Sequence, residues 1–236
     1  MELLGLTRIR NESLIIEDTI KHMLKYVPRI FVFDDASEDH TVDICKSFDA
    51  VTVFESNEWS PNRQWAETAH RNFLLEQARS MGAQWCLYMD ADERLVGDLP
   101  SMDAASPSAY RFQLFDGYMT NECALEYQSG LLEDIPRMWG PERRDITMLF
   151  RVSDSKYQGL DQREPVVSGD ISTTQVFVKH FGKCISVEQW EDTCDYYSTC
   201  FPEPYKSKWE SRKGKAIHTV SDFNRKLYSW DEVIRL

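Results

Sequence analysis

The stretch Trp85–Asp92, with the sequence WCLYMDAD, decides the fold predicted for this chain. Its first five residues form an apolar run typical of a buried strand, and the run is followed by the carboxylates Asp90 and Asp92. Ile30–Asp35, with the sequence IFVFDD, shows the same pattern earlier in the chain. Acids that follow buried strands predict a ligand site outside the carboxyl ends of the strands of a sheet.

Segments with helical periodicity separate the apolar runs of the first 92 residues. The predicted elements are, in order, a strand at 3–6, a helix at 16–27, a strand at 30–33, a helix capped by Ser37, a strand at 51–54, a helix at 65–78 and a strand at 85–89. The stripe of the last helix predicted to face inward consists of Trp65, Ala69, Phe73, Leu74 and Ala78. This alternation predicts an α/β fold with a Rossmann-like, mostly parallel sheet flanked by helices.

The second half of the chain is less regular and predicts a mixed acceptor-side region followed by helices. Strands are expected at Tyr110–Phe115, Ile146–Val152 and Gln175–Lys179. A capping box at Ser186–Gln189 predicts the start of a helix.

The predicted organisation is one domain with an extension. We expect a nucleotide-sugar-binding half at 1–95, an acceptor-binding and catalytic half of the same domain at 96–183, and a C-terminal helical extension at 184–236. The polar stretch 117–145 is the predicted substrate-shaping loop, since loops of that length usually serve a function.

The chain is acidic and contains enough apolar residues for a core: it has 236 residues, 42% of them hydrophobic, and a net charge of −12. This balance argues against nucleic-acid binding, which requires a basic surface. No apolar run approaches the ~20 residues of a transmembrane helix. The first residues do not resemble a secretion leader and the six cysteines are scattered, which predicts a cytoplasmic protein with reduced thiols.

Asp90-Ala91-Asp92 is the sharpest chemical signal in the sequence. Two carboxylates separated by one residue can turn toward one point and hold a hard divalent cation while phosphate oxygens complete its shell. The alternative is an ordinary acidic turn after a strand. An EF-hand is excluded because Arg94 stands at the fifth position and the glycine of that loop is missing.

Further polar motifs occur in a definite order before this signal. Thr7–Glu12 follows the first strand, Phe33–Thr41 follows the second, and His70-Arg71-Asn72 lies in the helix before the Asp-x-Asp strand. This arrangement resembles family 2 glycosyltransferases of the GT-A fold, in which the same motifs lead to a DXD motif. The resemblance is specific over residues 3–95 and looser to about residue 182.

The resemblance implies a nucleotide-sugar site with a role for each matching residue. Thr7 and Arg8 would line the nucleotide pocket, and Asp34 or Asp35 would accept hydrogen bonds from the base. Arg71 would meet the diphosphate, although a solvated helix arginine is the alternative. The full implied set is Thr7, Arg8, Asn11, Glu12, Asp34, Asp35, Arg71, Asp90 and Ala91.

A divalent cation, Mn²⁺ or Mg²⁺, is the implied cofactor. Asp92 would bind it directly and Asp90 would contact the metal or the ribose. His180, at the end of an apolar strand, is the third expected ligand by the same resemblance, and imidazole is compatible with Mn²⁺. The alternative for His180 is a partly buried histidine bonded to the backbone.

An inverting transfer also needs a carboxylate that takes the proton of the acceptor hydroxyl. The candidate acids of the second half are Asp116, Glu133, Asp134, Asp145, Asp161 and Glu164. The family's base usually follows the strand after the acceptor loop, so we expect Glu164 to be the base, with Asp161 second.

Two features bear on the acceptor. Trp139, read as a loop tryptophan between basic residues, is the candidate for stacking on an acceptor sugar, and a core role is the alternative. Five bases in residues 206–215 suggest contact with anionic lipid or a phosphorylated acceptor, against a solvated helix face as the default.

The function expected from these observations is a metal-dependent, inverting glycosyltransferase. Its donor would be a nucleoside diphosphate sugar, a UDP-sugar first, and its acceptor a glycan or a lipid- or protein-linked glycoconjugate, with peripheral membrane contact. One alternative is a sugar nucleotidyltransferase, although Leu4–Thr7 lacks the glycine-rich phosphate loop of that class. The other is a carbohydrate-binding domain that keeps the fold without catalysis.

Overall fold

A computed structural model describes residues 2–60, 62–160 and 162–236. The chain divides into two compact units. Unit 1 comprises Met1–Ala91, Gly97–Gln113 and Asp145–Val176, and unit 2 comprises Asp92–Val96, Leu114–Arg144 and Phe177–Leu236. The predicted boundary at residue 95 lies close to the first division, whereas the segments 97–113 and 145–176 return to unit 1.

Unit 1 contains the parallel sheet that the sequence predicts. Its four parallel strands stand in the order β3-β2-β1-β4, and β8 runs antiparallel beside β4. Their bounds are β1 (Leu3–Ile9), β2 (Ile30–Asp34), β3 (Val51–Glu55), β4 (Trp85–Tyr88) and β8 (Arg144–Arg151). The predicted α/β fold class is confirmed.

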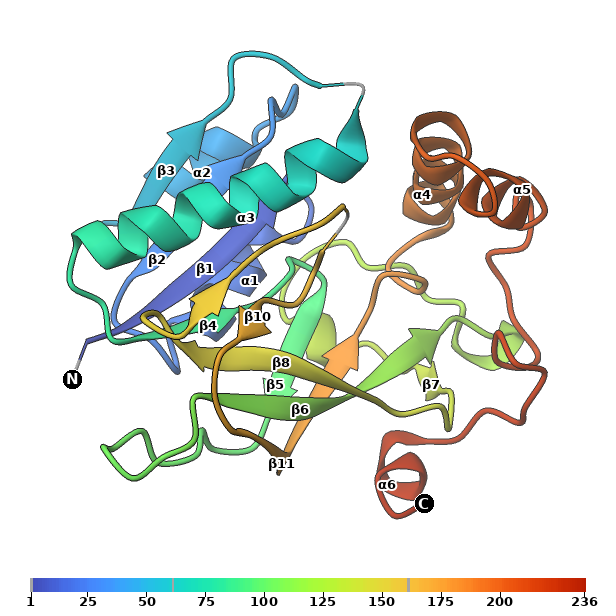
Figure 1. Ribbon diagram of the computed structural model, residues 1–236. Coiled ribbons are helices and arrows are strands. Elements are labelled where there is room, and N and C mark those ends of the chain that lie inside the picture. Colours follow the sequence, from blue (N-terminus) through green and yellow to red (C-terminus); the bar gives the residue numbers. More distant parts are fainter. Residues whose placement is uncertain (1, 61, 161) are drawn as a thin grey trace. The chain divides into compact units, whose positions relative to one another are not determined.

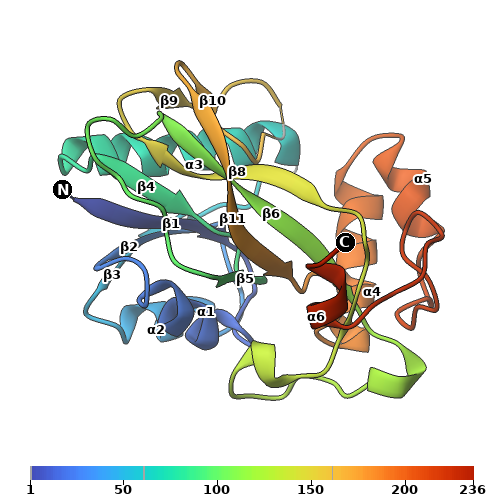
Figure 2. The same ribbon diagram turned by 90° about the horizontal axis from the view of Figure 1, so that it is seen from below.

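Helices cover both faces of this sheet (Figures 1 and 2). One face carries α1 (Ile16–Met23) and α2 (Thr41–Lys46), and the other carries α3 (Arg63–Ser80). Between α3 and the sheet lies a core of buried apolar side chains that includes Leu6, Leu74 and Phe150. The parallel strands are apolar along most of their length because both of their faces are covered.

Two helix predictions are wrong in detail. On α3 the buried apolar residues are Ala66, Leu74, Leu75 and Ala78, whereas Trp65 is 61% and Phe73 39% exposed. Helix α2 begins at Thr41, and Ser37 lies in the loop before it, where its hydroxyl accepts a hydrogen bond from the backbone N–H of Asn11.

The remaining strands of unit 1 follow the predicted pattern with longer bounds. Strands β6 (Ala109–Tyr118) and β11 (Ile171–His180) begin in unit 1 and end in unit 2. A small antiparallel pair, β9 (Ser155–Lys156) and β10 (Val166–Val167), completes unit 1.

Unit 2 is built on the last residues of β6 and β11. Strand β5 (Glu93–Val96) pairs antiparallel with Phe177–His180, and β7 (Met138–Trp139) pairs with the end of β6. The stretch predicted as a loop, 117–145, thus holds β7 and two short 3₁₀ helices, η1 (Asn121–Cys123) and η2 (Leu132–Asp134).

Three helices complete unit 2: α4 (Val187–Cys200), α5 (Tyr205–Glu210) and α6 (Trp230–Val233). Ser186 caps α4 as predicted, because its hydroxyl accepts a hydrogen bond from the N–H of Gln189. The rings of Tyr197 and Trp209 stack at 4.7 Å and join α4 to α5. None of the described helices is long and apolar enough to cross a membrane.

Candidate functional site

The predicted nucleotide residues of unit 1 gather where β1, β2 and β4 end. Arg8 is the residue before the last in β1, Asp34 ends β2 with Asp35 directly after it, and Asp90 follows β4. Parallel pairing places Arg8 beside Phe33 and Ile9 beside Asp34, so the ends of β1 and β2 are level. Ligands of α/β sheets bind outside this edge.

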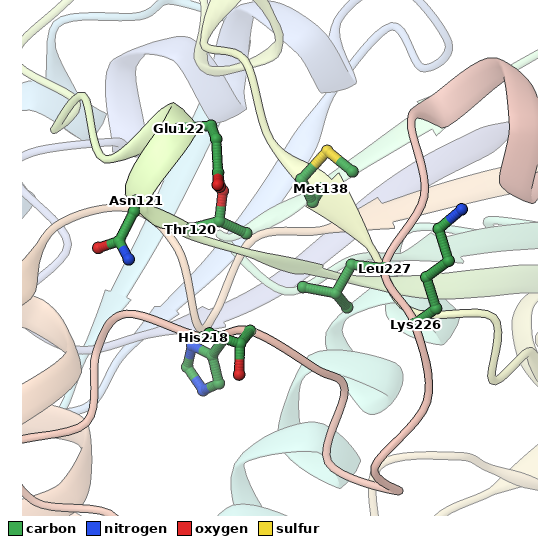
Figure 3. A pocket seen from close by; sticks show the side chains of 8 residues that line it. Thr120, Asn121, Glu122, Met138, His218, Lys226 and Leu227 are labelled. Carbon is green, nitrogen blue, oxygen red and sulfur yellow. The ribbon is translucent and has the colours of Figure 1, made fainter.

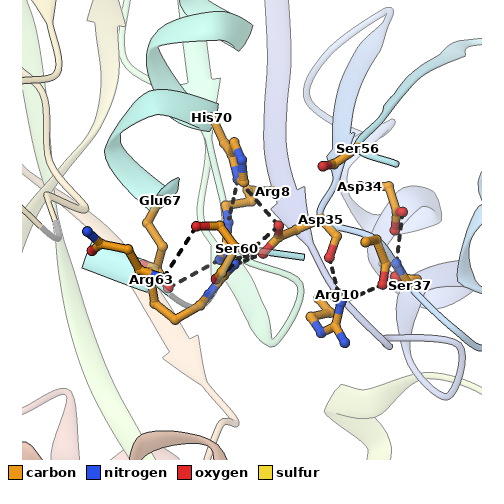
Figure 4. Close-up of polar contacts among 12 residues, drawn as sticks. Arg8, Arg10, Asp34, Asp35, Ser37, Ser56, Ser60, Arg63, Glu67 and His70 are labelled. Atoms are coloured by element: carbon orange, nitrogen blue, oxygen red, sulfur yellow. Dashed lines mark hydrogen bonds and ion pairs between the residues drawn. The ribbon is translucent and has the colours of Figure 1, made fainter. Parts of the chain in front are cut away.

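Asp35 is the centre of this edge (Figure 4). Its carboxylate is fully buried and accepts a hydrogen bond from Nη2 of Arg8 at 2.6 Å. Arg63, from the first turn of α3, donates to both oxygens of the same carboxylate and is itself fully buried. A buried carboxylate with two guanidinium partners is held in one position by geometry and by charge.

Glu67 joins the two arginines that the motifs single out. Its carboxylate lies 3.5 Å from Nη1 of Arg8 and 3.4 Å from Nη1 of Arg71. Arg71 is buried and also donates from Nε to the hydroxyl of Tyr88 at 3.0 Å. Burial opposes the charge of Arg71, but Tyr88, Asp90 and Glu67 outweigh it and raise its pKa. Arg71 is therefore a permanent cation beside Asp90 and not a solvated helix arginine.

His70 is a neutral member of the edge. Its ring stacks on Phe33 at 4.0 Å, and its Nδ1 accepts a hydrogen bond from Nε of Arg8 at 3.4 Å. Burial, together with Arg8, Arg63 and Arg71, lowers the pKa of His70 to about 3.

The loops after β1 and β2 are tied to each other by the predicted motif residues. The amide oxygen of Asn11 accepts from the N–H of Glu38, and the N–H of Glu12 donates to the Thr41 hydroxyl. Asp34 accepts from the N–H of Ser37 at 3.0 Å. Asn11, Glu12 and Asp34 thus shape the loops that carry Asp35.

Two buried oxygens at this edge have no hydrogen-bond partner among the described residues. They are Oγ1 of Thr7 and Oδ1 of Asp34. Buried polar atoms are usually paired, so an unpaired oxygen next to a candidate ligand site is a place where a bound molecule or water can supply the partner.

Asp90 and Ala91 end the first segment of unit 1. Asp90 accepts a hydrogen bond from Nε of Arg163 at 2.9 Å, and Arg163 comes from the segment between β9 and β10. Ala91 is buried, and its carbonyl accepts a hydrogen bond from the Thr19 hydroxyl at 2.6 Å. The carboxylate is thus accompanied by a cation, while the residue between the two acids is anchored to α1.

In unit 2, Asp92 and His180 face each other. Oδ2 of Asp92 lies 3.2 Å from Nε2 of His180, and Nδ1 of His180 lies 2.6 Å from Oδ1 of Asp116. Burial opposes the charge of His180, but the two carboxylates outweigh it and raise its pKa to about 10. Burial also works against the charge of Asp116, yet His180, Lys183 and Arg144 hold its pKa well below the usual range.

The residues around Asp92 fit a divalent cation that replaces the proton on Nε2 of His180, because a histidine nitrogen must be deprotonated to bind a metal. A metal-binding histidine usually donates its other ring nitrogen to a carboxylate, and here Asp116 takes Nδ1 and leaves Nε2 toward Asp92. Gly182 keeps the space open, because a Cβ there would lie 2.4 Å from Oδ2 of Asp92 and 3.0 Å from Nε2 of His180. Among the described residues no three His, Cys, Asp or Glu side chains form a metal cluster. Two protein ligands suffice where substrate phosphates complete the shell.

Lys183 extends this charged group toward the C-terminal segment. Its Nζ donates to Asp116 and to Asp222, each at 2.8 Å, and lies 3.4 Å from the Tyr118 hydroxyl. Asp222 also pairs with Arg212 at 2.7 Å. The orientation of His180 therefore depends on residues far along the chain.

The remaining predicted site residues are placed differently. Glu164 accepts a hydrogen bond from the N–H of Thr147 in β8 at 2.7 Å, and Asp161 lies outside the described residues. The predicted loop position of Trp139 is wrong: it lies in β7, is 3% exposed, and packs edge-to-face on Phe181 and Trp230. Its ring is part of the core of unit 2, which corrects the expectation of sugar stacking.

Sequence reasoning missed several residues that complete both groups. They are Arg63, Glu67 and Arg163 in unit 1 and Lys183 and Asp222 in unit 2. Helical spacing places Glu67 four residues before Arg71 and was the one available signal, because such pairs face each other on a helix.

The chain is similar to a known family over its first part. Residues 7–99 match the family described as glycosyl transferase family 2, a segment shorter than half of the chain. The match contains every motif residue from Thr7 to Asp92. No curated protein matches the chain.

Several solved structures are similar to this chain at low identity. Mannosyl-3-phosphoglycerate synthase from Rubrobacter xylanophilus shares 17% identity over 58% of this chain and 45% of its own, with a TM-score of 0.33. A protein from Desulfovibrio desulfuricans G20, assigned as a nucleotide-diphospho-sugar transferase, shares 8% over 100% and 98%, with a TM-score of 0.39. A 4-diphosphocytidyl-2C-methyl-D-erythritol synthase shares 12% over 64% and 75%, also with a TM-score of 0.39.

The polar edge of the parallel strands lies within the segment that matches this family. The family match over residues 7–99 confirms the resemblance to family 2 glycosyltransferases and supports a glycosyltransferase.

Proposed function

We propose that this protein transfers one sugar from a nucleoside diphosphate sugar to a hydroxyl group of a glycan or glycoconjugate, with inversion and with Mn²⁺ or Mg²⁺ bound. The observation that carries the proposal is the family match over residues 7–99 together with the meeting of Arg8, Asp35 and Arg71 at one sheet edge. The donor proposed first is a UDP-sugar.

The nucleoside is recognised by Asp35. Its carboxylate accepts hydrogen bonds, so it matches a base with a ring N–H such as uracil. Arg8 is 12% exposed while Arg63 is fully buried, so Arg8 is the guanidinium that can turn toward the ligand. Arg63 then keeps the carboxylate ionised and in position.

The diphosphate is accompanied by cations in a protein of net charge −12. Arg71 and Arg163 supply positive charge next to Asp90. A cation held by Asp92 and His180 would act as a Lewis acid on the leaving diphosphate. Fixed charges of this kind favour the transition state, in which negative charge grows on the leaving group.

Glu164 is the proposed general base. Its Oε2 is held by the N–H of Thr147, which fixes the carboxyl group on β8 and leaves Oε1 to accept the proton of the acceptor hydroxyl. Asp161 is the second choice. We also propose a reducing compartment such as the cytoplasm, since all six cysteines are free thiols.

Thermal shift tests the donor site directly. The panel is UDP, GDP, dTDP and their sugars, each with Mn²⁺ or EDTA, on wild type, Asp92→Asn and the control Asp98→Asn, which changes an exposed acid of unit 1. We expect one nucleotide to stabilise wild type and the control only with Mn²⁺, and Asp92→Asn not to respond.

The outcomes separate the alternatives. If a nucleotide raises the melting temperature of wild type equally with Mn²⁺ and with EDTA, metal dependence is refuted. If no nucleotide raises the melting temperature, the alternative of a carbohydrate-binding domain without catalysis is favoured. Release of pyrophosphate from a nucleoside triphosphate and a sugar phosphate would instead identify a nucleotidyltransferase. Slow metal-dependent hydrolysis of one nucleotide sugar would identify the donor. NMR of the anomeric proton of the transfer product would establish inversion.

A further inference from the structure

Unit 2 contains a cavity of about 330 Å³ that the donor-site residues do not line (Figure 3). Its walls are residues 120–122, which follow β6 and begin η1, Met138 of β7, and residues 218–219 and 226–227 of the C-terminal segment. In Figure 3 the side chain of Leu227 lies between Met138 and His218, with residues 120–122 on the side opposite Lys226. This volume falls within the range of small-molecule sites, about 300–1,000 Å³.

The walls of the cavity are held by backbone hydrogen bonds. The N–H of His218 donates to the carbonyl of Met119 at 2.8 Å. Trp139 and Tyr228 exchange backbone hydrogen bonds at 2.8 and 2.9 Å, next to Met138 and Leu227. The C-terminal segment is thus fixed to β6 at one end and to β7 at the other, so the cavity is formed before a ligand arrives.

The lining combines an apolar surface with several polar groups and is close to neutral. Asn121, Glu122, Thr219 and Lys226 are exposed and bring an amide, a carboxylate, a hydroxyl and an ammonium group. Burial lowers the pKa of His218, whose ring is therefore neutral at pH 7. One acid and one base cancel, which disfavours a phosphate, a ligand that usually gathers several cations. Mixed donors and acceptors over an apolar floor of Met138 and Leu227 suit a neutral ligand rich in hydroxyl groups.

A chain of side-chain contacts connects the cavity wall to the charged group of Asp92 and His180. The ring of His218 meets the ring of Tyr118 edge-to-face at 5.1 Å. The Tyr118 hydroxyl lies 3.4 Å from Nζ of Lys183, and Lys183 bonds Asp116, which orients His180. Three side chains in series, Tyr118, Lys183 and Asp116, therefore connect the wall of the cavity to the proposed metal ligand His180 within the same unit.

We propose that this cavity binds a neutral sugar unit of the acceptor. The assignment as the acceptor rests on the proposed glycosyltransferase function, whereas sugar binding itself does not. The ligand class is an uncharged pyranose, with its hydroxyl groups on Asn121, Thr219 and the facing polar residues and its apolar face on Leu227.

Saturation-transfer NMR on the full chain tests the proposal. The probes are glucose, galactose, mannose and N-acetylglucosamine, with glycerol 3-phosphate as the anionic probe. Thr219→Trp and Asn121→Trp fill the cavity from exposed positions, and Gln128→Trp places the same ring at an exposed position of unit 2 outside it. Thermal melts establish that each variant is folded, and Asn121→Ala serves if the larger substitutions are not.

We expect at least one neutral sugar to bind wild type and Gln128→Trp equally. In the cavity variants its Kd should rise at least tenfold, the equivalent of about 1.4 kcal/mol. The proposal is overturned if no sugar binds, if binding survives both tryptophans, or if only glycerol 3-phosphate binds. If a nucleotide with Mn²⁺ raises the melting temperature but no sugar binds, only the assignment of the cavity is refuted. If a sugar binds but no nucleotide raises the melting temperature, only the proposed function is refuted.

Discussion

Replacing Asp35 by asparagine should destabilise the protein strongly. The substitution keeps the shape of the side chain and removes its charge, so the fully buried guanidinium of Arg63 and the 12% exposed side chain of Arg8 lose the buried carboxylate with which both of them pair. Removal of one partner from a buried ion pair costs about 3–5 kcal/mol, because the remaining charge is buried and unpaired.

A change of that size is easy to measure. For a chain of 150–250 residues, 1 kcal/mol shifts the melting temperature by about 2–4 °C, so Asp35→Asn should melt roughly 6–20 °C below wild type. The matched control is Glu38→Gln in the same loop region. Its side chain is 80% exposed and lies 3.4 Å from Arg10, so its loss should cost about 0–1 kcal/mol.

Thermal and urea unfolding of both variants test this reasoning. A double variant, Asp35→Asn with Arg63→Met, should recover part of the lost stability, because it also removes the unpaired charge. The reasoning is refuted if Asp35→Asn loses no more stability than Glu38→Gln. It is also refuted if the stability losses of the single variants Asp35→Asn and Arg63→Met simply add up in the double variant, because coupled partners should not be additive.

Three further predictions concern separate parts of the molecule. Gly182→Ala should weaken Mn²⁺ binding at least tenfold by calorimetry, since its Cβ would lie 2.4 Å from Oδ2 of Asp92; unchanged binding would contradict the proposed metal site. Burial and nearby arginines lower the pKa of His70 to about 3, so below the usual pKa of about 6.5 the unfolded chain takes up a proton that the folded chain does not. The free energy of unfolding therefore decreases as the pH decreases. From pH 7 to pH 5, urea unfolding should show that His70→Gln loses about 2 kcal/mol less of this free energy than wild type does, and an equal loss in both proteins would refute this. Trp139→Ala should cost about 3–5 kcal/mol, against about 0.5 kcal/mol or less for the 61% exposed Trp65→Ala, and equal melting temperatures would restore a surface role for Trp139.

The sequence predicted the architecture of unit 1 because its signals are local. An apolar run followed by acids, as at Trp85–Asp92, is visible without knowing what lies next to it, and it fixed both the strand and the edge of the sheet. The choice of inward face on α3 failed for a related reason. Large aromatic residues were favoured, whereas the face that packs on the sheet uses Leu74, Leu75 and Ala78, and Phe73 only touches the margin through Phe33 and Phe54.

Most of the candidate site needed contacts that no local pattern records. Asp35 meets Arg63 across 28 residues, and Asp90 meets Arg163 across 73. No local sequence pattern identifies the ion-pair partner of an arginine or a lysine, since the position of its side chain depends on the whole fold. Trp139 was misplaced for the same reason, because its short strand exists only where β6 and the segment around Tyr228 flank it.

The bonds of Lys183 to Asp116 and Asp222 bear on how this protein can be re-engineered. The segment that lines the cavity at 218–227 also contains Asp222, one of the two carboxylates that pair with Lys183. If the cavity binds the acceptor as proposed, a chimera that imports this segment from another protein should change the acceptor preference and the orientation of His180 together unless residue 222 remains an acid. Acceptor preference and metal affinity are thus expected to change as a linked pair of traits in any such graft.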